Sequence, residues 1–439
     1  MQLESVFVVN GLSAQAAASL YRYRRDALRL SLTSPTLFAG VQFPLGSDQS
    51  FISVYHSFYQ DPSFLYLTGL NQLGCFLLMD PKTQEDILFL PEKDAKKEFW
   101  EGFYLGYTPE GGSELCDLLC VDHVYANTTL FDAISTLFRN RKEEELGFLY
   151  YENGSDFLLD LKTKINGFLK KSCPHVRIKS VEALIWEQRL CLDHQQYLLL
   201  KEAHAKTARA FAKTLNSIQT CTLENEVAAC LDAEIKRESW YGNSFPSIVA
   251  SGENACVLHY NANNAPLKGL LLLDFGLRWH EVLTDISRTI PVSGVANPLQ
   301  TLLLSIVLET QHCVEAKVKA GVSMVELDTL AWTTLNQLMD KHLLSKGGVW
   351  KKSYDVQPHR IGHAIGIAVH DGDPKRHYMK EGLRPNMLIS NEPGVYGYFE
   401  LTIGGKRYSE CLGIRIEDNL WITDQGCENM SKDILGKPS

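Results

Sequence analysis

The feature that most constrains this chain is a group of strongly apolar, strand-like segments that each end on, or are interrupted by, an acidic side chain. These segments lie at 270–276, 282–291, 387–396 and 412–422. The acidic residues within them are Asp274, Asp285, Glu392 and Glu417. An ionised carboxylate in an apolar strand is costly unless it is paired or bound to a metal. The chain must therefore fold so that four buried-strand carboxylates find partners.

Asp274 and Asp285 lie in neighbouring segments that predict a β-hairpin turning between Leu277 and Val282. This hairpin would bring the two carboxylates together across a sheet. Adjacent carboxylates repel, so the pKa of one rises unless a cation lies between them. A divalent metal would resolve the conflict. The alternative is that Asp274 caps a strand while Asp285 pairs with Arg288.

Three histidines, His359, His363 and His370, lie within the twelve residues 359–370. Gly362 and Gly366 lie on either side of His363, and several β-branched residues follow it, which favours a turn that enters a strand over a helix. A single histidine in such a segment would usually be structural. Three together indicate a site, because imidazole serves as a metal ligand, a proton carrier and an oxyanion partner.

The two glutamates lie at the edges of predicted strands. Pro393 and Gly394 would stop one strand just past Glu392. Glu417 alternates with Arg415 on one strand face, and a surface ion pair would explain that spacing as well as a site would.

Four carboxylates and one imidazole form a mainly hard-oxygen donor set that suits Mn²⁺, Co²⁺ or Fe²⁺, whereas structural zinc favours cysteine. Two cations bridged by carboxylates can hold a water molecule and make hydroxide at neutral pH. Such a hydroxide could attack an amide carbonyl.

Another histidine pattern carries no such site: His280-Glu281 starts like a zinc-peptidase motif, but Thr284 replaces the second histidine. We expect His280 and His377 to lie on the surface.

Composition excludes several other classes. The net charge of −9 argues against nucleic-acid binding, which relies on clustered Lys and Arg. Eleven cysteines, with no CxxC pair, fit reduced thiols in a reducing compartment.

With no signal-peptide pattern and no apolar run approaching about 18 residues, we expect a cytoplasmic protein without a membrane contact. Residues 5–25 lack acids and faintly resemble an organellar import signal, but a structural helix is the preferred interpretation.

Apolar runs alternate with helical patterns until Ser172-Cys173-Pro174, which predicts an N-terminal α/β domain over residues 1–175. The remainder, 176–439, contains helical stretches at 181–218 and 298–344, each followed by strand-like sequence. A capping box is expected at Ser323–Glu326. This weak repeat of roughly 100 residues predicts a duplicated α+β unit with a site between its halves.

The order of the motifs resembles the M24 metallopeptidases, which have the pita-bread fold, and among them the aminopeptidase P branch. The matching segments are 251–260, 270–276, 284–294, 359–371, 391–396 and 413–418. The N-terminal third resembles the same branch at 24–28, 57–69 and 100–102. Methionine aminopeptidases lack such a domain. The resemblance covers nearly the whole chain and implies an α+β catalytic domain with a pseudo-twofold repeat.

By this resemblance, five residues take metal-ligand positions for two divalent ions, with Mn²⁺ expected and Co²⁺, Fe²⁺ or Zn²⁺ as alternatives. They are Asp274, Asp285, His363, Glu392 and Glu417, of which Asp285 and Glu417 are expected to contact both ions. Glu392 is also the expected general base. His259, His359 and His370 fall at positions for substrate binding and proton transfer, and Arg415 supports the ligands.

The resemblance implies an Xaa-Pro aminopeptidase, which releases the first residue of peptides that have proline second. The nearest alternative is an Xaa-Pro dipeptidase, although such enzymes often have a longer insertion between the last two glutamates. A non-catalytic pita-bread protein that binds a macromolecule is a more distant alternative, and a creatinase-like hydrolase another. The family also implies a homodimer or homotetramer, in which Trp100 of one subunit could shape the substrate cavity of another.

Overall fold

The computed structural model describes residues 2–41, 60–139, 141, 144–151, 156–373 and 376–436. The chain divides into two compact units, Met1–Arg189 and Leu190–Ser439. This division falls after the sequence-based boundary at residue 175, because β6 (Arg177–Ser180) pairs in parallel with β5 (Glu145–Phe148) and so completes the N-terminal sheet. Of the N-terminal segments that carried the family resemblance, residues 57–59 lie outside the described part.

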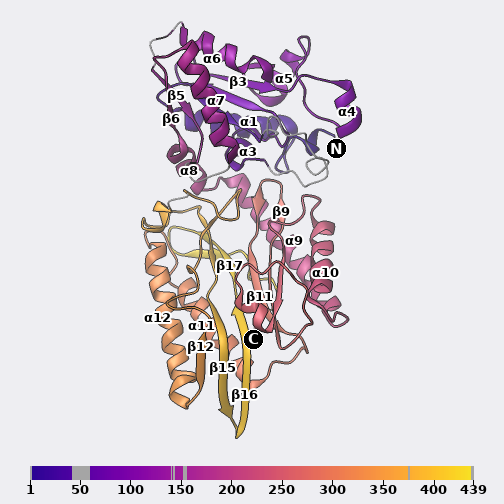
Figure 1. Ribbon diagram of the computed structural model, residues 1–439, viewed down its shortest axis with the longest axis vertical. Coiled ribbons are helices and arrows are strands. Elements are labelled where there is room, and N and C mark those ends of the chain that lie inside the picture. Colours follow the sequence, from indigo (N-terminus) through magenta and orange to yellow (C-terminus); the bar gives the residue numbers. More distant parts are fainter. Residues whose placement is uncertain are drawn as a thin grey trace. The chain divides into compact units, whose positions relative to one another are not determined.

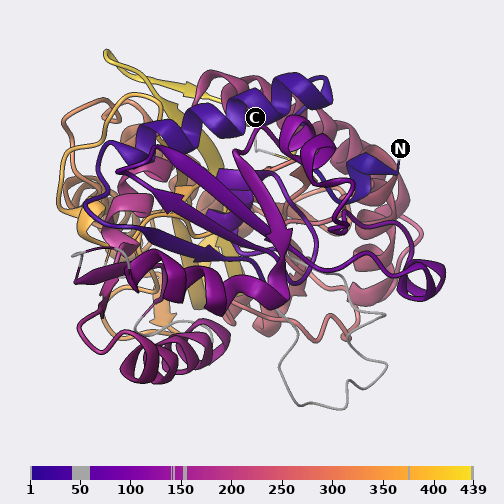
Figure 2. The same cartoon turned by 90° about the horizontal axis from the view of Figure 1, so that it is seen from above.

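The N-terminal unit contains a six-stranded sheet in the order β4-β3-β2-β1-β5-β6. Its other strands are β1 (Thr36–Ala39), β2 (Phe76–Asp80), β3 (Glu85–Leu90) and β4 (His123–Ala126). Its helices are α1 (Ala14–Arg29), α3 (Pro62–Thr68), α4 (Ala95–Glu101), α5 (Gly112–Leu119), α6 (Leu130–Arg139), α7 (Asp156–Ser172) and α8 (Glu182–Leu190). Apolar side chains of α6 and α7 pack on one face of the sheet, and α1 runs along the other side (Figure 2). The predicted alternation of strands and helices is confirmed.

Helix α1 shows that the acid-poor segment is an integral part of this unit. Ser13 caps the helix by accepting a hydrogen bond from the Ala16 amide. Tyr21 and Arg25, further along the helix, are buried. The structural helix expected from the sequence is therefore present.

The C-terminal unit is built from two similar halves (Figure 1). The first has the helices α9 (His194–Ile218) and α10 (Glu224–Glu238), then the antiparallel strands β7 (Ile248–Ser251), β8 (Leu270–Phe275) and β11 (Ile286–Pro291). The second has α11 (Pro298–Glu315) and α12 (Met324–His342), then β12 (Val349–Lys352), β15 (Gly394–Ile403) and β16 (Lys406–Arg415). In each half a helical hairpin packs beside a three-stranded antiparallel sheet, as the repeat predicted.

Shorter strands complete this unit. They are β9 (Arg278–Trp279), β10 (Val282–Leu283), β13 (Ala364–Ile365), β14 (Leu388–Asn391), β17 (Asp418–Ile422) and β18 (Cys427–Asn429). The predicted capping box is formed: the Ser323 hydroxyl accepts from the Glu326 amide, and the Glu326 carboxylate accepts from the Ser323 amide.

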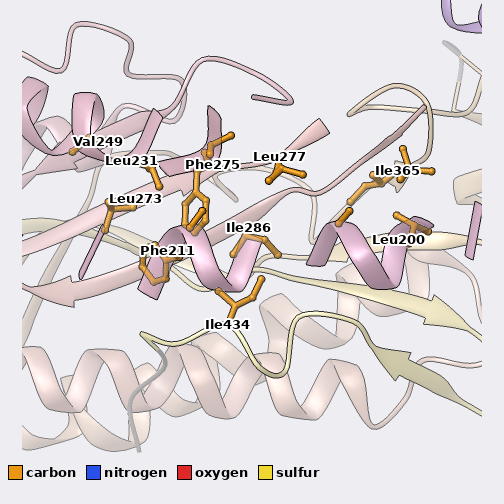
Figure 3. Close-up of a cluster of buried hydrophobic side chains, with 14 of the residues drawn as sticks. Leu200, Phe211, Leu231, Val249, Leu273, Phe275, Leu277, Ile286, Ile365 and Ile434 are labelled. Carbon is orange, nitrogen blue, oxygen red and sulfur yellow. The ribbon is translucent and has the colours of Figure 1, made fainter. Parts of the chain in front are cut away.

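Strand β8 explains how an apolar segment presents an acid. Leu273 and Phe275 point into the core formed with α9 and α10, where the Phe211 and Phe275 rings stack with centroids 4.7 Å apart (Figure 3). Because successive side chains of a strand alternate between faces, Leu272 and Asp274 point the opposite way. The packing of one face therefore fixes the direction of the carboxylate on the other.

Candidate metal centre

The predicted hairpin brings the first two acids to one face. Strands β8 and β11 pair antiparallel with Asp274 opposite Ser287, and Asp285 lies two residues before that serine. The turn continues through β9 and β10, so its tip falls between Leu277 and Val282 as expected. The alternative pairing of Asp285 with Arg288 is wrong, because Arg288 donates to Asp418 Oδ1 at 2.9 Å.

The two glutamates occupy breaks between consecutive strands. Glu392 lies between β14 and β15, and Glu417 lies between β16 and β17. Arg415 and Glu417 are 4% and 2% exposed, so the alternative of a surface ion pair is wrong. The Ser287 hydroxyl donates to Glu417 Oε2 at 2.8 Å, and the Glu417 amide donates to the Ser287 carbonyl at 3.0 Å. Backbone and side chain together fix this glutamate against the first half of the unit.

His363 reaches the acids from the turn before β13, as its local sequence predicted. Its Nε2 lies 3.4 Å from Asp285 Oδ2 and 3.6 Å from Glu392 Oε1. The ring of His370 lies against it, with centroids 4.1 Å apart. Burial lowers the pKa of His363, but Asp285 and Glu392 outweigh this effect, so the net pKa is raised.

All the residues proposed from sequence line one polar hollow of about 70 Å³. They are His259, Asp274, Asp285, His359, His363, His370, Glu392, Arg415 and Glu417. A second pocket of about 370 Å³ shares Asp274, Asp285, His259 and His370 with it and adds apolar walls. The arrangement places a small charged compartment next to a space of the size that binds small ligands.

The charges in the hollow are unbalanced. Burial raises the pKa of Glu392 to about 7 and that of Asp274 to about 6, and the acids repel one another further. The pKa of Glu417 is raised by the same causes. Among the described residues that line this hollow, Arg415 alone has a permanent positive charge. The site is therefore short of positive charge.

Two buried carboxylate oxygens among the described residues that line this hollow have no hydrogen-bond partner. They are Asp274 Oδ1 and Glu417 Oε1. Ligand atoms of Asp285, His363 and Glu417 lie within 4.8 Å of one another, close enough to share an ion. Unpartnered oxygens, crowded acids and one imidazole all fit a divalent cation.

The other two histidines of the cluster stay neutral at pH 7. Burial lowers the pKa of His359 to about 4, and the positive charge of Arg415 lowers it further. Burial and His363 lower the pKa of His370 to about 4. His359 Nε2 lies 3.0 Å from the Tyr396 hydroxyl. Neutral imidazoles can accept or donate a proton, so both groups suit proton transfer.

Sequence reasoning missed several residues that hold this site. The Tyr396 hydroxyl accepts at 3.3 Å from Arg415, the residue that the sequence did indicate and that donates to Asp274 Oδ2 at 2.5 Å. The side-chain amide of Asn419 bonds the backbone of Asp285 twice: Nδ2 donates to the carbonyl at 2.7 Å, and Oδ1 accepts from the amide at 3.1 Å. His204 Nε2 lies 3.0 Å from Asn419 Oδ1. Tyr396 belongs to the segment 391–396, which carried part of the family resemblance. His204 is a single histidine in α9, and no sequence pattern distinguishes it.

The expectation that His280 lies on the surface is wrong. It is 9% exposed at the tip of the β9–β10 hairpin, with its Nδ1 lying 3.0 Å from the Tyr241 hydroxyl and its ring packed on Trp279. His377 is exposed as expected. Neither histidine lines the metal centre.

Comparison with known proteins agrees with this geometry. The model of "Metallopeptidase family M24" matches residues 199–424, which is half of the chain. This chain belongs to metallopeptidase family M24. The model "Aminopeptidase P, N-terminal domain" matches residues 21–146. Both matches confirm the resemblance to the aminopeptidase P branch.

Curated relatives cover most of the chain. A "Probable Xaa-Pro aminopeptidase" of Verticillium alfalfae is 29% identical over 418 residues, spanning 86% of this chain and 85% of its own. "Intermediate cleaving peptidase 55, mitochondrial" of Arabidopsis thaliana is 27% identical, spanning 87% and 74%. The structure of Escherichia coli aminopeptidase P with the inhibitor Pro-Leu superposes with a TM-score of 0.80 at 23% identity, covering 96% of both chains. This likeness confirms the α+β pita-bread fold.

Hydropathy of the helices adds one further finding. No helix in the described ranges combines the length and the apolar character needed to cross a membrane.

Proposed function

We propose that this M24 metallopeptidase is an Xaa-Pro aminopeptidase, which removes the first residue from peptides that have proline second. The observation that carries the proposal is one buried hollow in which four carboxylates and an imidazole converge beside a larger pocket. Matches to both an M24 catalytic region and an aminopeptidase P N-terminal domain support the same activity. The relatives named as Xaa-Pro aminopeptidases support the proline preference.

The residues that would hold two divalent cations are Asp274, Asp285, His363, Glu392 and Glu417. The unpartnered oxygens of Asp274 and Glu417 support this set, because each is left free to bind an ion. Oxygen-rich donors with one imidazole favour Mn²⁺, with Co²⁺, Fe²⁺ and Zn²⁺ as alternatives. Such ions, when bound, activate water near neutral pH and polarise a carbonyl.

The chain's own residues supply proton transfer. Glu392 is the proposed general base, since its carboxylate lies in the hollow, with Oε1 3.6 Å from His363 Nε2, where it can accept and return a proton. His359, neutral and held by Tyr396, and His370, neutral against His363, are placed to pass a proton or donate to a developing oxyanion. Arg415 orients Asp274 through their ion pair.

The larger pocket fits a short peptide with an apolar ring. Phe245, Pro246, Ile248 and Val369 contribute apolar walls, while Asn261 and the exposed His259 contribute polar edges. A prolyl nitrogen carries no hydrogen and its ring fixes φ. Apolar walls that contact the ring would therefore favour proline without requiring a donor from the peptide nitrogen.

Assembly and location are part of the proposal. We expect a homodimer or homotetramer, with peptides as the partners of the active site. Phe99 and Trp100 on α4 are 84% and 73% exposed, with rings 6.1 Å apart, which makes this aromatic pair a candidate contact for another subunit. Light scattering of the wild-type chain and of Trp100→Ala tests the assembly. We also expect the protein to be cytoplasmic. Fluorescent tagging of the natural protein would distinguish a cytoplasmic from a mitochondrial location.

The activity is tested with three peptides and the Mn²⁺-loaded chain. We expect release of the first residue from Xaa-Pro-Yaa and none from Xaa-Ala-Yaa. Hydrolysis of the dipeptide Xaa-Pro alone would identify a dipeptidase instead. If no peptide is cleaved with any of the four metals, the catalytic proposal fails and the non-catalytic alternative is favoured.

A further inference from the structure

Two cysteines outside the proposed machinery lie side by side in the C-terminal unit. Cys256 ends the short 3-10 helix η3 (Gly252–Cys256), and Cys411 lies in β16 opposite Tyr398. Their sulfur atoms are 4.0 Å apart, although the residues are 155 positions apart in sequence. Both side chains are partly exposed free thiols. Small solutes can therefore reach the pair.

The backbone holds these two thiols together. A Cβ placed on Gly413 would lie 2.0 Å from the Ala255 carbonyl oxygen, so η3 and β16 approach each other as only a glycine permits. Cys256 also donates to the Leu412 carbonyl at 3.3 Å. With their backbones in contact, the two sulfur atoms lie about 2 Å beyond the disulfide bond length of about 2.05 Å, a small gap to close.

We propose that Cys256 and Cys411 are a modification site that forms a reversible disulfide when the protein meets a hydroperoxide. One of the two sulfurs attacks the peroxide, the O–O bond breaks, and a sulfenic acid forms with release of water or an alcohol. The other sulfur then attacks the sulfenic acid, its proton leaves with the hydroxyl as water, and the S–S bond forms. Two thiols are oxidised by two electrons and one peroxide is reduced.

The bond would tie together two segments that reach the metal centre. His259 follows Cys256 by three residues, and Arg415 follows Cys411 by four. The bond would hold the His259 segment against β16 and restrict its movement. We therefore expect turnover to fall on oxidation, a consequence that rests on the proposed function, whereas the bond itself does not.

The bond is tested in the full-length, Mn²⁺-loaded protein treated with hydrogen peroxide and digested without reductant. We expect one linked peptide pair that contains Cys256 and Cys411, lost on treatment with dithiothreitol. Cys256→Ser and Cys411→Ser should each prevent the link. Cys313→Ser, at a half-buried thiol whose sulfur lies 3.7 Å from the Thr334 hydroxyl, is the matched control and should leave it unchanged. Cys221 and Cys230 are another pair of neighbouring thiols, joined by a side-chain hydrogen bond. A link between those two only, or no link while other thiols are oxidised, would overturn the proposal.

The effect on turnover is measured separately. We expect at least about a threefold fall in kcat on oxidation of the wild-type chain, recovery with dithiothreitol, and no such fall in Cys411→Ser. A mapped bond with unchanged turnover refutes the effect on the metal centre and leaves the site standing. A reduced protein that cleaves no Xaa-Pro peptide contradicts the proposed function, while the mapped link still decides the disulfide.

Discussion

Two buried charge clusters, one in each unit, are built on opposite principles. In the N-terminal unit, Asp86 is fully buried and both its oxygens are bonded, Oδ2 by Arg25 at 2.6 Å and Oδ1 by Arg29. In the C-terminal unit, four acids share one arginine, and oxygens of Asp274 and Glu417 are left without a partner. The first cluster supplies its own countercharge, whereas the second requires one from outside.

The N-terminal arginines also use backbone acceptors. Arg25 donates to the carbonyls of Leu67 at 2.9 Å and Cys120 at 2.5 Å. These bonds tie α1 to α3 and α5, so the cluster joins elements of the fold. A buried ion pair that is complete in this way is structural, while a buried group of like charges indicates a bound ion.

The largest effect is expected from removing one charge of the metal centre. Glu417→Gln and Asp285→Asn should each lower metal-dependent kcat/KM by about a thousandfold or more, because the ions that activate water lose a ligand. Circular dichroism should show a retained fold. Glu400→Gln, whose pair with the exposed Arg407 lies outside the hollow, is the matched control and should keep metal binding. Unchanged turnover in both acid variants would show that the site is wrongly assigned.

Asp86→Asn tests the buried charge cluster of the N-terminal unit. It leaves Arg25 buried without a countercharge and Arg29 paired with Asp26 alone, so the free energy of unfolding should fall by about 3 to 5 kcal/mol in urea titrations. Asp122→Asn, whose pair with Arg22 is partly exposed, should cost no more than about 1 kcal/mol. Equal losses in the two variants would contradict a special role for the buried pair.

The stability of the metal-free protein should depend on pH through the buried acids of the C-terminal cluster. Glu392 has a folded-state pKa of about 7 and Asp274 one of about 6, both above their ordinary values. The folded state thus holds protons that the unfolded chain releases, and this stabilisation, complete below about pH 4, is lost as pH rises to about 7. Calorimetry should therefore show a larger rise in Tm on adding Mn²⁺ at pH 8 than at pH 5. Equal shifts at the two pH values would argue against coupled acids.

The smallest effect is expected for Tyr396→Phe. The variant removes the hydroxyl that lies between Arg415 and His359, at 3.3 and 3.0 Å, and should lower kcat/KM by about tenfold, as for the loss of one or two hydrogen bonds. Tyr354→Phe, a neighbouring ring 6.5 Å away, serves as the control and should change little. A shift in the pH profile of Tyr396→Phe alone would tie this effect to His359.

The sequence anticipated the composition of the candidate site better than the contacts inside it. Apolar strands that end in acids predicted Asp274, Asp285, Glu392 and Glu417, since a buried carboxylate needs a partner in any fold. The clustered histidines added His363 because repetition in a short segment is rare. His204 and Asn419 escaped notice, since a lone histidine in an amphipathic helix and an asparagine after a motif have many uses.

What the sequence by itself determined is which residues had to be buried together, and with them the α+β architecture, because hydrophobic pattern and carboxylate placement follow from local chemistry. What only the tertiary structure decided is which charges pair. Arg288 and Arg415 each have several acids nearby in the sequence. Local sequence does not distinguish which of these arginine–acid pairs forms. The strand register and the alternation of faces send Arg288 to Asp418 and Arg415 to Asp274, which leaves Glu417 and Asp285 without an arginine partner in the described part of the chain.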